Sequence, residues 1–189
     1  MTETPNPNIV DADSLTGDMR PIRRCVISMG SNVGDRLAKL QGGLDSLADT
    51  PEVWVTEVSP VYETEPVEAP EGSESFLNVV VLVDTTLPAH MLLDRALAIE
   101  AAFGRERSDV RNAPRSLDVD LIVVGERRAH DESLVLPHPR AHERAFVLVP
   151  WADVEPDAKI PGVGAVADLL EKTGRAGVAR RDDVKLELH

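Results

Sequence analysis

The sequence has little of what disulfide-stabilised, membrane-spanning or nucleic-acid-binding proteins need. It has a single cysteine, Cys25, so it cannot form an internal disulfide, and no apolar run approaches the ~20 residues of a membrane span. Its net charge of -13 leaves no overall basic surface for a nucleic acid. We therefore expect a cytoplasmic protein that binds neither nucleic acid nor membrane. Its 189 residues suit one domain, and we expect a monomer with at most weak self-association.

Two other scarcities limit how the chain could bind a ligand. Aromatic residues make up only 3% of it, and neither glycine-rich nucleotide motif, G-x-G-x-x-G or G-x-x-x-x-G-K-[ST], is present. A Rossmann or P-loop mechanism therefore lacks its signature. Arginine side chains and a metal ion would have to bind any phosphate groups instead.

Hydrophobic periodicity and turn residues predict an α+β fold. Strands are expected at 22–29, 53–58, 76–83 and 117–124, with helices between Asp35 and Pro51, between Pro88 and Gly104, at 140–149 and at 166–172. The first six elements follow the order strand, helix, strand, strand, helix, strand, which is the βαββαβ pattern of ferredoxin-like folds. Such a core has an antiparallel sheet with its helices on one face, which leaves the other face open to ligands. The last two helices are C-terminal additions.

Three further segments complete the predicted organisation. Residues 1–21 have no apolar period and are expected to form a disordered acidic tail. Residues 176–189 are expected to form a charged C-terminal tail, which leaves a single domain at 22–175. Inside this domain, residues 59–75 contain three prolines and no clear period, and a loop of that length is more often a binding loop than a simple connection.

The strand predicted at 117–124 carries two carboxylates. Asp118 and Asp120 are two residues apart, so in a strand they point to one face, while Val119 and Leu121 point to the other. A solvent-facing edge strand would also tolerate such a pair. The rest of the strand has the composition of a core strand, however, and neighbouring carboxylates repel each other unless a cation is present. We therefore predict a divalent metal site, with Mg2+ the best match for oxygen ligands.

Four arginines precede this strand, namely Arg105, Arg107, Arg111 and Arg115. They could form a solvated charged face. An arginine fork also matches phosphate oxygens, and Arg115 lies only three residues before Asp118, where a phosphate could bridge the guanidinium and the metal. Beside a metal site, this cluster predicts a nucleoside polyphosphate as the ligand.

Two polar residues stand out from their surroundings. Asn78 interrupts the otherwise apolar strand predicted at 76–83. His138 lies between two prolines and could be a structural histidine. With His142 and a carboxylate it could also form a zinc site, although an H-x-x-x-H spacing suits a helix and Pro139 would lie at the start of that helix.

Taken together, the segment RNAPRSLDVDLI at 111–122 resembles the signature of the 6-hydroxymethyl-7,8-dihydropterin pyrophosphokinases, enzymes of folate biosynthesis. Other parts of the family pattern occur in the same order over about residues 24–170. They are Gly30-Ser31-Asn32, Tyr62 with Thr64 and Pro66, Phe76-Leu77-Asn78, Ile99-Glu100, Gly104-Arg105, Pro137-His138 and Arg144-Ala145-Phe146. The ferredoxin-like fold of the family agrees with the predicted order of elements.

The resemblance implies transfer of pyrophosphate from ATP to the hydroxymethyl group of the reduced pterin, with release of AMP. It implies that Asp118 and Asp120 hold two Mg2+ ions and that Arg105 and Arg115 act with them in catalysis. The implied ATP-binding residues are Glu100, Arg105, Arg107, Arg115, His138 and Arg144. The implied pterin-binding residues are Thr64, Pro66, Val67, Phe76, Asn78 and Phe146. The two phenylalanines would stack on the ring and Asn78 would match its polar edge.

Two alternatives remain open from the residues alone. A two-metal nucleotidyltransferase would use the same carboxylates on a palm-like sheet and would release pyrophosphate. A non-catalytic ferredoxin-like module would bind a small metabolite without turning it over.

Overall fold

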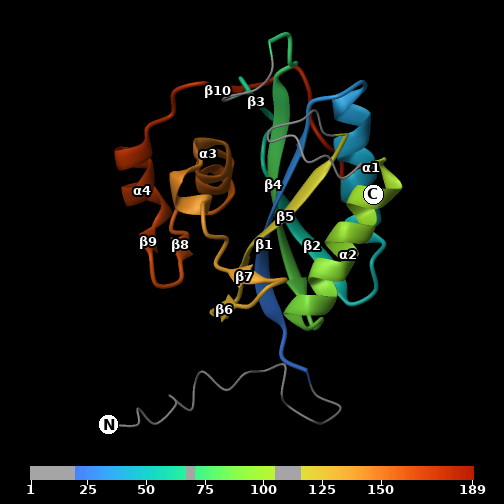
Figure 1. The fold of residues 1–189 in the computed structure, drawn as a ribbon, viewed down its shortest axis with the longest axis vertical. Helices are drawn as coiled ribbons and strands as arrows, with labels where there is room; N and C mark the ends of the chain where they lie inside the picture. The colour runs from blue at the N-terminus through green and yellow to red at the C-terminus, as the bar shows by residue number, and fades with distance from the viewer. Residues whose placement is uncertain (1–19, 67–70, 105–115) are drawn as a thin grey trace.

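An antiparallel sheet forms the centre of the molecule (Figure 1). The computed structural model describes residues 20–66, 71–104 and 116–189. The main sheet contains β1 (Arg23–Ser31), β2 (Val53–Val58), β3 (Tyr62–Thr64), β4 (Phe76–Thr85), β5 (Asp118–Val124) and β10 (Val178–Arg180). Its strand order is β10-β3-β4-β1-β5, with β2 also paired to β4, and all of these pairs are antiparallel. The predicted α+β class and antiparallel sheet are confirmed.

Helices cover both faces of this sheet (Figure 1). On one face lie α1 (Arg36–Ala48) and α2 (Ala89–Ala102). On the other lie α3 (Ala145–Val154), α4 (Val166–Thr173) and the 3-10 turn η3 (Ala141–Glu143). Two small hairpins pair β6 (Ala129–His130) with β7 (Val135–Leu136) and β8 (Lys159–Ile160) with β9 (Gly164–Ala165). The expectation of helices on one face only is therefore wrong, because the C-terminal additions bury part of the second face.

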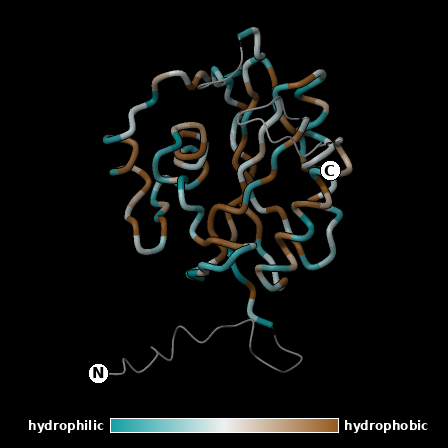
Figure 2. Tube along the Cα trace, viewed as in Figure 1, coloured by the Kyte–Doolittle hydropathy of each residue, from teal (hydrophilic) through white to brown (hydrophobic). Residues whose placement is uncertain are grey.

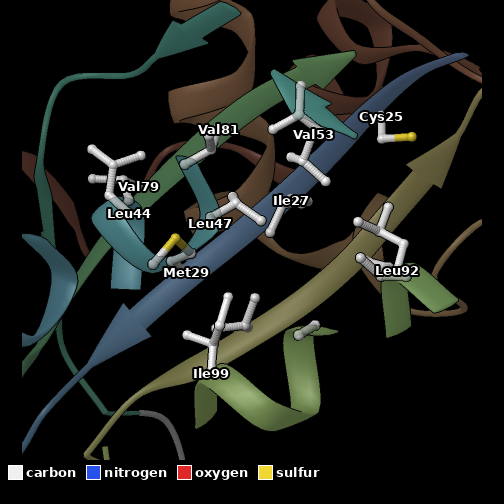
Figure 3. Packing of buried hydrophobic residues seen from close by; sticks show 14 of the residues in the cluster. Cys25, Ile27, Met29, Leu44, Leu47, Val53, Val79, Val81, Leu92 and Ile99 are labelled. Carbon is white, nitrogen blue, oxygen red and sulfur yellow. The ribbon is translucent and has the colours of Figure 1, made fainter. Parts of the chain in front are cut away.

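The composition of β4 explains why helices are needed on both sides. Successive side chains of a strand alternate between faces, and β4 is apolar at most positions. Val79 and Val81 join the core beneath α1 and α2, whereas Val80 and Leu82 join a second core with Trp151 of α3. Figure 2 shows the apolar central strands, and Figure 3 shows the first core. A strand that is apolar on both faces has to be covered on both.

The helix ends follow the local sequence. Asp35, where the first helix was expected to begin, caps α1, because its Oδ1 accepts a hydrogen bond from the Ala38 N–H at 3.0 Å. Pro88, the expected start of the second helix, is the N-cap residue of α2. Gly104, at φ 78°, follows the end of α2, where the left-handed region favours glycine. Cys25 is buried in the core.

Three short features differ from the expectation. Gly30 and Ser31 belong to β1, which extends two residues beyond the strand expected at 22–29. The stretch 59–75 contains β3, and the expected C-terminal tail contributes β10, which pairs with β3. Strands of three residues carry almost no periodic signal, so the sequence pattern could not reveal them. Residues 1–19 of the expected N-terminal tail lie outside the described residues. None of the described helices is long and apolar enough to cross a membrane.

Candidate active site

The two carboxylates of β5 lie where alternation along the strand predicts. Asp118 and Asp120 are half-buried on one face, whereas Val119 and Leu121 are buried on the other, in the core beneath α1 and α2. Among the described residues, no group of three or more histidines, cysteines, aspartates or glutamates could hold a metal ion. A cation at this carboxylate pair would therefore need further ligands, such as water or phosphate oxygens. That donor set suits Mg2+, which commonly binds only one or two protein carboxylates.

Glu100 of α2 supports β5 from the side. Its side chain is buried, and its Oε1 accepts a hydrogen bond from the Val119 N–H at 2.9 Å. An edge strand such as β5 has N–H groups that face away from its neighbour, and Glu100 binds one of them between Asp118 and Asp120. The side chain therefore holds the strand that carries both carboxylates.

A cavity of about 310 Å³ opens beside this edge, between α2, β5 and β7. Glu100, Asp120 and His138, three residues predicted from the sequence, line it together. Its apolar wall includes Leu93, Leu97, Leu121, Leu134 and Val135. An apolar wall with a few convergent polar groups is typical of a small-molecule site. No sequence pattern pointed to this wall, because its residues come from separate elements.

Backbone contacts orient His138 at the cavity. Its N–H donates to the Ile122 O of β5 at 2.8 Å, and its Nδ1 accepts from the Arg140 N–H at 3.1 Å. Burial lowers the pKa of His138 below its usual value, while the nearby Asp120 carboxylate acts in the opposite direction. A neutral imidazole whose Nδ1 accepts a hydrogen bond has Nε2 as its donor. The alternative of a zinc site with His142 finds no support, because no metal-binding cluster occurs in the described chain.

Arg144 and Phe146, at the start of α3, connect the carboxylates to the rest of this face. Arg144 Nη1 lies 3.7 Å from Asp120 Oδ2, and its Cζ lies 5.5 Å from the centre of the Phe146 ring. The guanidinium therefore interacts with a carboxylate and with an aromatic ring. A residue predicted to bind ATP is thus in contact with one predicted to bind the pterin.

A second polar group lies two strands away from β5. Asn78 is buried in β4, and its Nδ2 donates to the Thr64 Oγ1 of β3 at 2.6 Å. Gly30 of β1 pairs with Asn78 on one side and with Asp118 on the other. Cross-strand partners point to the same face, so Asn78 and Asp118 share a face about 10 Å apart, at two strand spacings. The sheet thus brings a predicted metal ligand close to the amide predicted to bind the pterin.

Gly30 lies next to two predicted site residues, a contact that the sequence pattern did not reveal. A Cβ atom at this position would lie 2.7 Å from the Asn78 Oδ1 and 3.6 Å from the Phe76 Cδ1. The absent side chain therefore leaves room for the Asn78 amide over β1. A glycine inside a strand indicates the close approach of a neighbour, which was the available signal. Phe76 is half-buried two residues before Asn78, on the same face, and Pro66 is half-buried beyond β3.

Several predicted site residues lie outside the described residues: Val67, Arg105, Arg107 and Arg115. The first described residue after the arginine segment, Ser116, is anchored to its neighbours. Ser31 Oγ donates to the Ser116 O at 2.5 Å, and Lys39 Nζ donates to the Ser116 Oγ at 3.3 Å. Neither Ser31 nor Lys39 was predicted as a site residue on its own, and both fix the point where the chain enters β5.

Comparison with known proteins identifies the family of this chain. A family model described as 7,8-dihydro-6-hydroxymethylpterin-pyrophosphokinase matches residues 26–156. A protein of Methylorubrum extorquens named 2-amino-4-hydroxy-6-hydroxymethyldihydropteridine pyrophosphokinase is 42% identical over 157 residues, which cover 83% of this chain and 98% of that protein. Proteins of the same name are 40% identical in Mycobacterium tuberculosis, over 86% of this chain and 89% of theirs. In Pseudomonas aeruginosa the identity is 36%, over 84% of this chain and 97% of theirs.

Solved structures share the fold at low sequence identity. A crystal structure described as HPPK-DHPS in complex with substrates has a TM-score of 0.60 at 14% identity, over 80% of this chain. Plasmodium falciparum HPPK-DHPS, wild type with pteroate, has a TM-score of 0.62 at 13% identity, over 87% of this chain. This chain spans only 43% and 47% of those two longer chains. At such identities the likeness shows the α+β fold alone.

Proposed function

Because the chain belongs to the 7,8-dihydro-6-hydroxymethylpterin-pyrophosphokinase family, we propose that it transfers pyrophosphate from ATP to 6-hydroxymethyl-7,8-dihydropterin in folate biosynthesis. The hydroxymethyl oxygen bonds to the β-phosphorus, the bond from that phosphorus to the α,β-bridging oxygen breaks, AMP leaves, and the hydroxyl proton passes to solvent. One observation carries the proposal for this chain. The row of Asn78, Gly30 and Asp118 sets an amide suited to a flat heterocycle beside carboxylates suited to a cation.

Asp118 and Asp120 are our proposed ligands of two Mg2+ ions. When bound, Mg2+ supplies charge neutralisation at the ATP phosphates. The protein contributes the alignment of the two carboxylates. Pairing with Gly30 sets the position of Asp118, Arg144 lies 3.7 Å from Asp120, and Glu100 holds the strand between them.

The cavity beside β5 is our proposed site for the nucleotide. Its leucine-rich wall suits the flat faces of a base, and Glu100 and His138 supply polar groups among the lining residues. Arg144, whose Nη1 lies 3.7 Å from Asp120 Oδ2, is a proposed ligand of the phosphate oxygens. Arg105, Arg107 and Arg115, which lie outside the described residues, complete the proposed phosphate ligands, with Arg105 and Arg115 acting in catalysis. Transfer of this kind depends on positioning and electrostatic stabilisation more than on acid–base groups.

The face around Asn78 is our proposed pterin pocket. Its proposed members are Thr64, Pro66, Val67, Phe76, Asn78 and Phe146. An asparagine amide offers both donors and an acceptor, which the edge of a pterin requires. One Asn78 donor is used by Thr64, and this bond fixes which way the amide faces. The half-buried rings of Phe76 and Phe146 offer surface on which a flat ring can stack.

Further parts of the proposal concern fold type and assembly. We propose the ferredoxin-like description for the core, which is supported by the antiparallel order β3-β4-β1-β5 with α1 and α2 on one face. The monomeric state stays a prediction from the sequence. The domain limits at 22–175 and the cytoplasmic location stay predictions.

An AMP-forming assay tests the proposed activity. The chain is mixed with ATP, Mg2+ and 6-hydroxymethyl-7,8-dihydropterin, and AMP and the pterin diphosphate are separated by chromatography. We expect both products in equal amounts and neither when the pterin is left out. Release of pyrophosphate with a nucleotidyl-linked product would instead indicate the nucleotidyltransferase. Pterin binding without turnover would indicate the non-catalytic module.

A further inference from the structure

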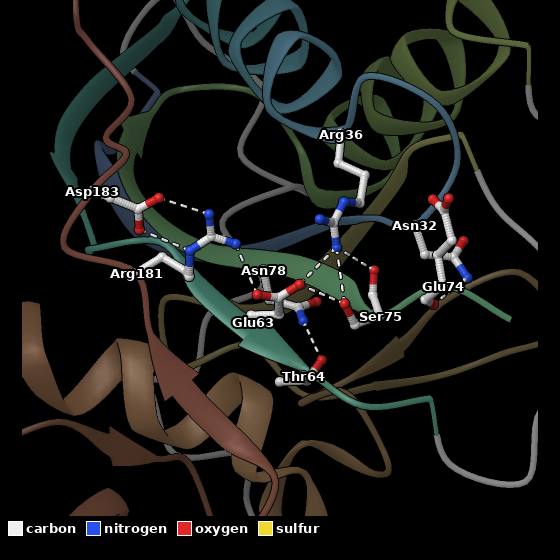
Figure 4. A network of polar contacts seen from close by, with 9 residues as sticks. All are labelled: Asn32, Arg36, Glu63, Thr64, Glu74, Ser75, Asn78, Arg181 and Asp183. Atoms are coloured by element: carbon white, nitrogen blue, oxygen red, sulfur yellow. Dashed lines mark hydrogen bonds and ion pairs between the residues drawn. The ribbon is translucent and has the colours of Figure 1, made fainter.

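Behind the face that carries Thr64 and Asn78 lies a polar network centred on Glu63 (Figure 4). Glu63 directly precedes Thr64 in β3, and Ser75 directly precedes Phe76 at the start of β4. Because the side chains of a strand alternate between faces, Glu63 points away from the face of Thr64. Glu63 and Ser75 therefore each lie one position before a proposed pterin contact, Thr64 and Phe76 respectively.

Three segments of the chain bind the Glu63 carboxylate. Its Oε1 accepts hydrogen bonds from Arg36 Nη1 at 3.0 Å and from the Ser75 Oγ at 2.5 Å. Its Oε2 accepts from Arg181 Nη1 at 2.8 Å. Arg36 also donates to the backbone O of Ser75 at 2.7 Å. The first turn of α1, the start of β4 and the C-terminal part of the chain therefore meet at one carboxylate.

Arg181 belongs to a C-terminal strap, residues 178–187, that runs from the edge of β3 to α1. In this strap β10 pairs with β3, and the Arg181 N–H donates to the Val61 O at 2.8 Å. Gln41 of α1 exchanges two hydrogen bonds with the backbone of Glu187. The strap lies outside the segment that matches the family model. It covers the edge of the strand that carries Thr64.

The network differs from an ordinary surface ion pair. An exposed pair contributes little, because solvent screens it and two long side chains have to be ordered. The Arg181 and Glu63 side chains are only 30% and 29% exposed, and the carboxylate accepts from three different side chains. The Ser75 and Arg36 hydrogen bonds lower the pKa of Glu63 to about 2. The carboxylate is therefore ionised and held in place at neutral pH.

We infer that Glu63 is a positioning residue for the pterin pocket, held by Arg36 of α1 and Arg181 of the strap. The inference rests on the proposed function, since it takes Thr64 and Asn78 to be pterin contacts. The network fixes β3 against the start of β4 and so sets the 2.6 Å hydrogen bond between Thr64 and Asn78. This bond orients the amide that meets the pterin edge. The carboxylates of β5 lie beyond β1, and none of the hydrogen bonds to Glu63 described above involves β5.

Steady-state kinetics of the full chain test this role with Glu63→Gln and Arg181→Ala. We expect the KM for the pterin to rise about five- to tenfold, as for residues coupled in one hydrogen-bond network, while kcat and the KM for ATP stay within about twofold. Arg181→Lys keeps the charge and should restore part of the loss. The matched control is Lys185→Ala, which removes a charge from the same strap, where the ammonium pairs with Glu187. This control should leave the pterin KM unchanged.

An unchanged pterin KM in both variants would overturn the inference. A five- to tenfold fall in kcat with no change in the pterin KM would overturn it as well. Melting temperature and circular dichroism of each variant identify any that does not fold. If Arg181→Ala does not fold, the nearly isosteric Glu63→Gln decides. A wild-type chain that forms no AMP overturns the proposed function itself. If the wild type turns over normally and both variants keep the wild-type pterin KM, only the positioning role is overturned.

Discussion

The two halves of the proposed site are built differently. In the pterin half, Asn78 is 4% exposed and its amide is bonded to Thr64 at 2.6 Å. In the carboxylate half, the Asp120 side chain is 37% exposed and lies 3.7 Å from Arg144. The first half is a closed, hydrogen-bonded unit, whereas in the second half Asp120 presents its charge to solvent.

This difference indicates which half of the proposed site is ordered before its ligand binds. A buried polar group is costly without a partner, so Asn78 receives one inside the protein. Neighbouring carboxylates such as Asp118 and Asp120 repel each other, and a bound cation relieves that repulsion. The pterin half is therefore preorganised, while the carboxylate half depends on what binds to it. Substitutions should alter affinity in the first half and turnover in the second.

The largest effect is expected at the carboxylates. Asp118→Asn or Asp120→Asn should lower kcat at least ~100-fold, the scale of losing a key electrostatic group, while the fold stays intact. The AMP-forming assay and the melting temperature measure both quantities. Asp84→Asn is a matched control, because its side chain is also 37% exposed and lies 3.8 Å from Arg24, away from the site. Near-normal turnover of the two β5 variants would remove the metal assignment.

A smaller effect is expected in the preorganised half, at Gly30. In Gly30→Ala the new Cβ would meet the Asn78 Oδ1 at 2.7 Å, so the amide has to shift. We expect the pterin KM to rise about tenfold and the free energy of unfolding to fall by about 1–3 kcal/mol, the cost of overpacking. Kinetics and denaturant unfolding measure these changes.

The double variant with Asn78→Ala shows whether this contact is the cause. If the clash is with Asn78, Gly30→Ala should cost less stability in the Asn78→Ala background than in the wild type. Equal costs in both backgrounds would mean that the steric argument for Gly30 is wrong.

The smallest effect concerns pH and the support behind the pterin half. Hydrogen bonds from Ser75 and Arg36 lower the pKa of Glu63 from 4.5 to about 2. A carboxyl whose pKa is lower in the folded state stabilises the fold above its unfolded value and loses that contribution as pH falls. The melting temperature of wild type should therefore exceed that of Glu63→Gln at pH 7, and the gap should shrink from pH 4.5 towards pH 2.

Differential scanning calorimetry at pH 7 and pH 3 measures this gap. Glu57→Gln, at an exposed position of β2, serves as the control for losing a carboxylate from the same sheet. A gap that stays constant down to pH 3 would mean that the ionised Glu63 carboxylate is not what the network stabilises.

The features that could be predicted from the sequence depend on residues close together in the chain. The alternation around Asp118 and Asp120 placed both carboxylates on one face, because strand geometry repeats every two residues. Asp35 could be recognised as a helix cap, since its hydrogen bond reaches only three residues ahead. Asn78 stood out because one polar residue interrupted an apolar strand. Local spacing alone was enough for these features.

Other features needed the tertiary structure, because they depend on which distant segments become neighbours. The role of Gly30 exists only because Asn78 lies across from it in β4. The strap contacts Glu63 from the far end of the chain. Strands of three residues, such as β10, have too little periodic pattern for their pairing to be predicted from the sequence. Likewise, α3 and α4 cover the second face because β4 is apolar on both sides.

The sequence by itself thus determined the α+β class, the carboxylate pair on β5 and the unusual amide in β4. Each follows from the fixed periodicity of helices and strands and from side-chain chemistry. Only the tertiary structure decided that the amide and the carboxylates share a face, that Gly30 separates them, and that Glu63 supports one half from behind. Cross-strand register sets these relations, and register is a property of the whole sheet.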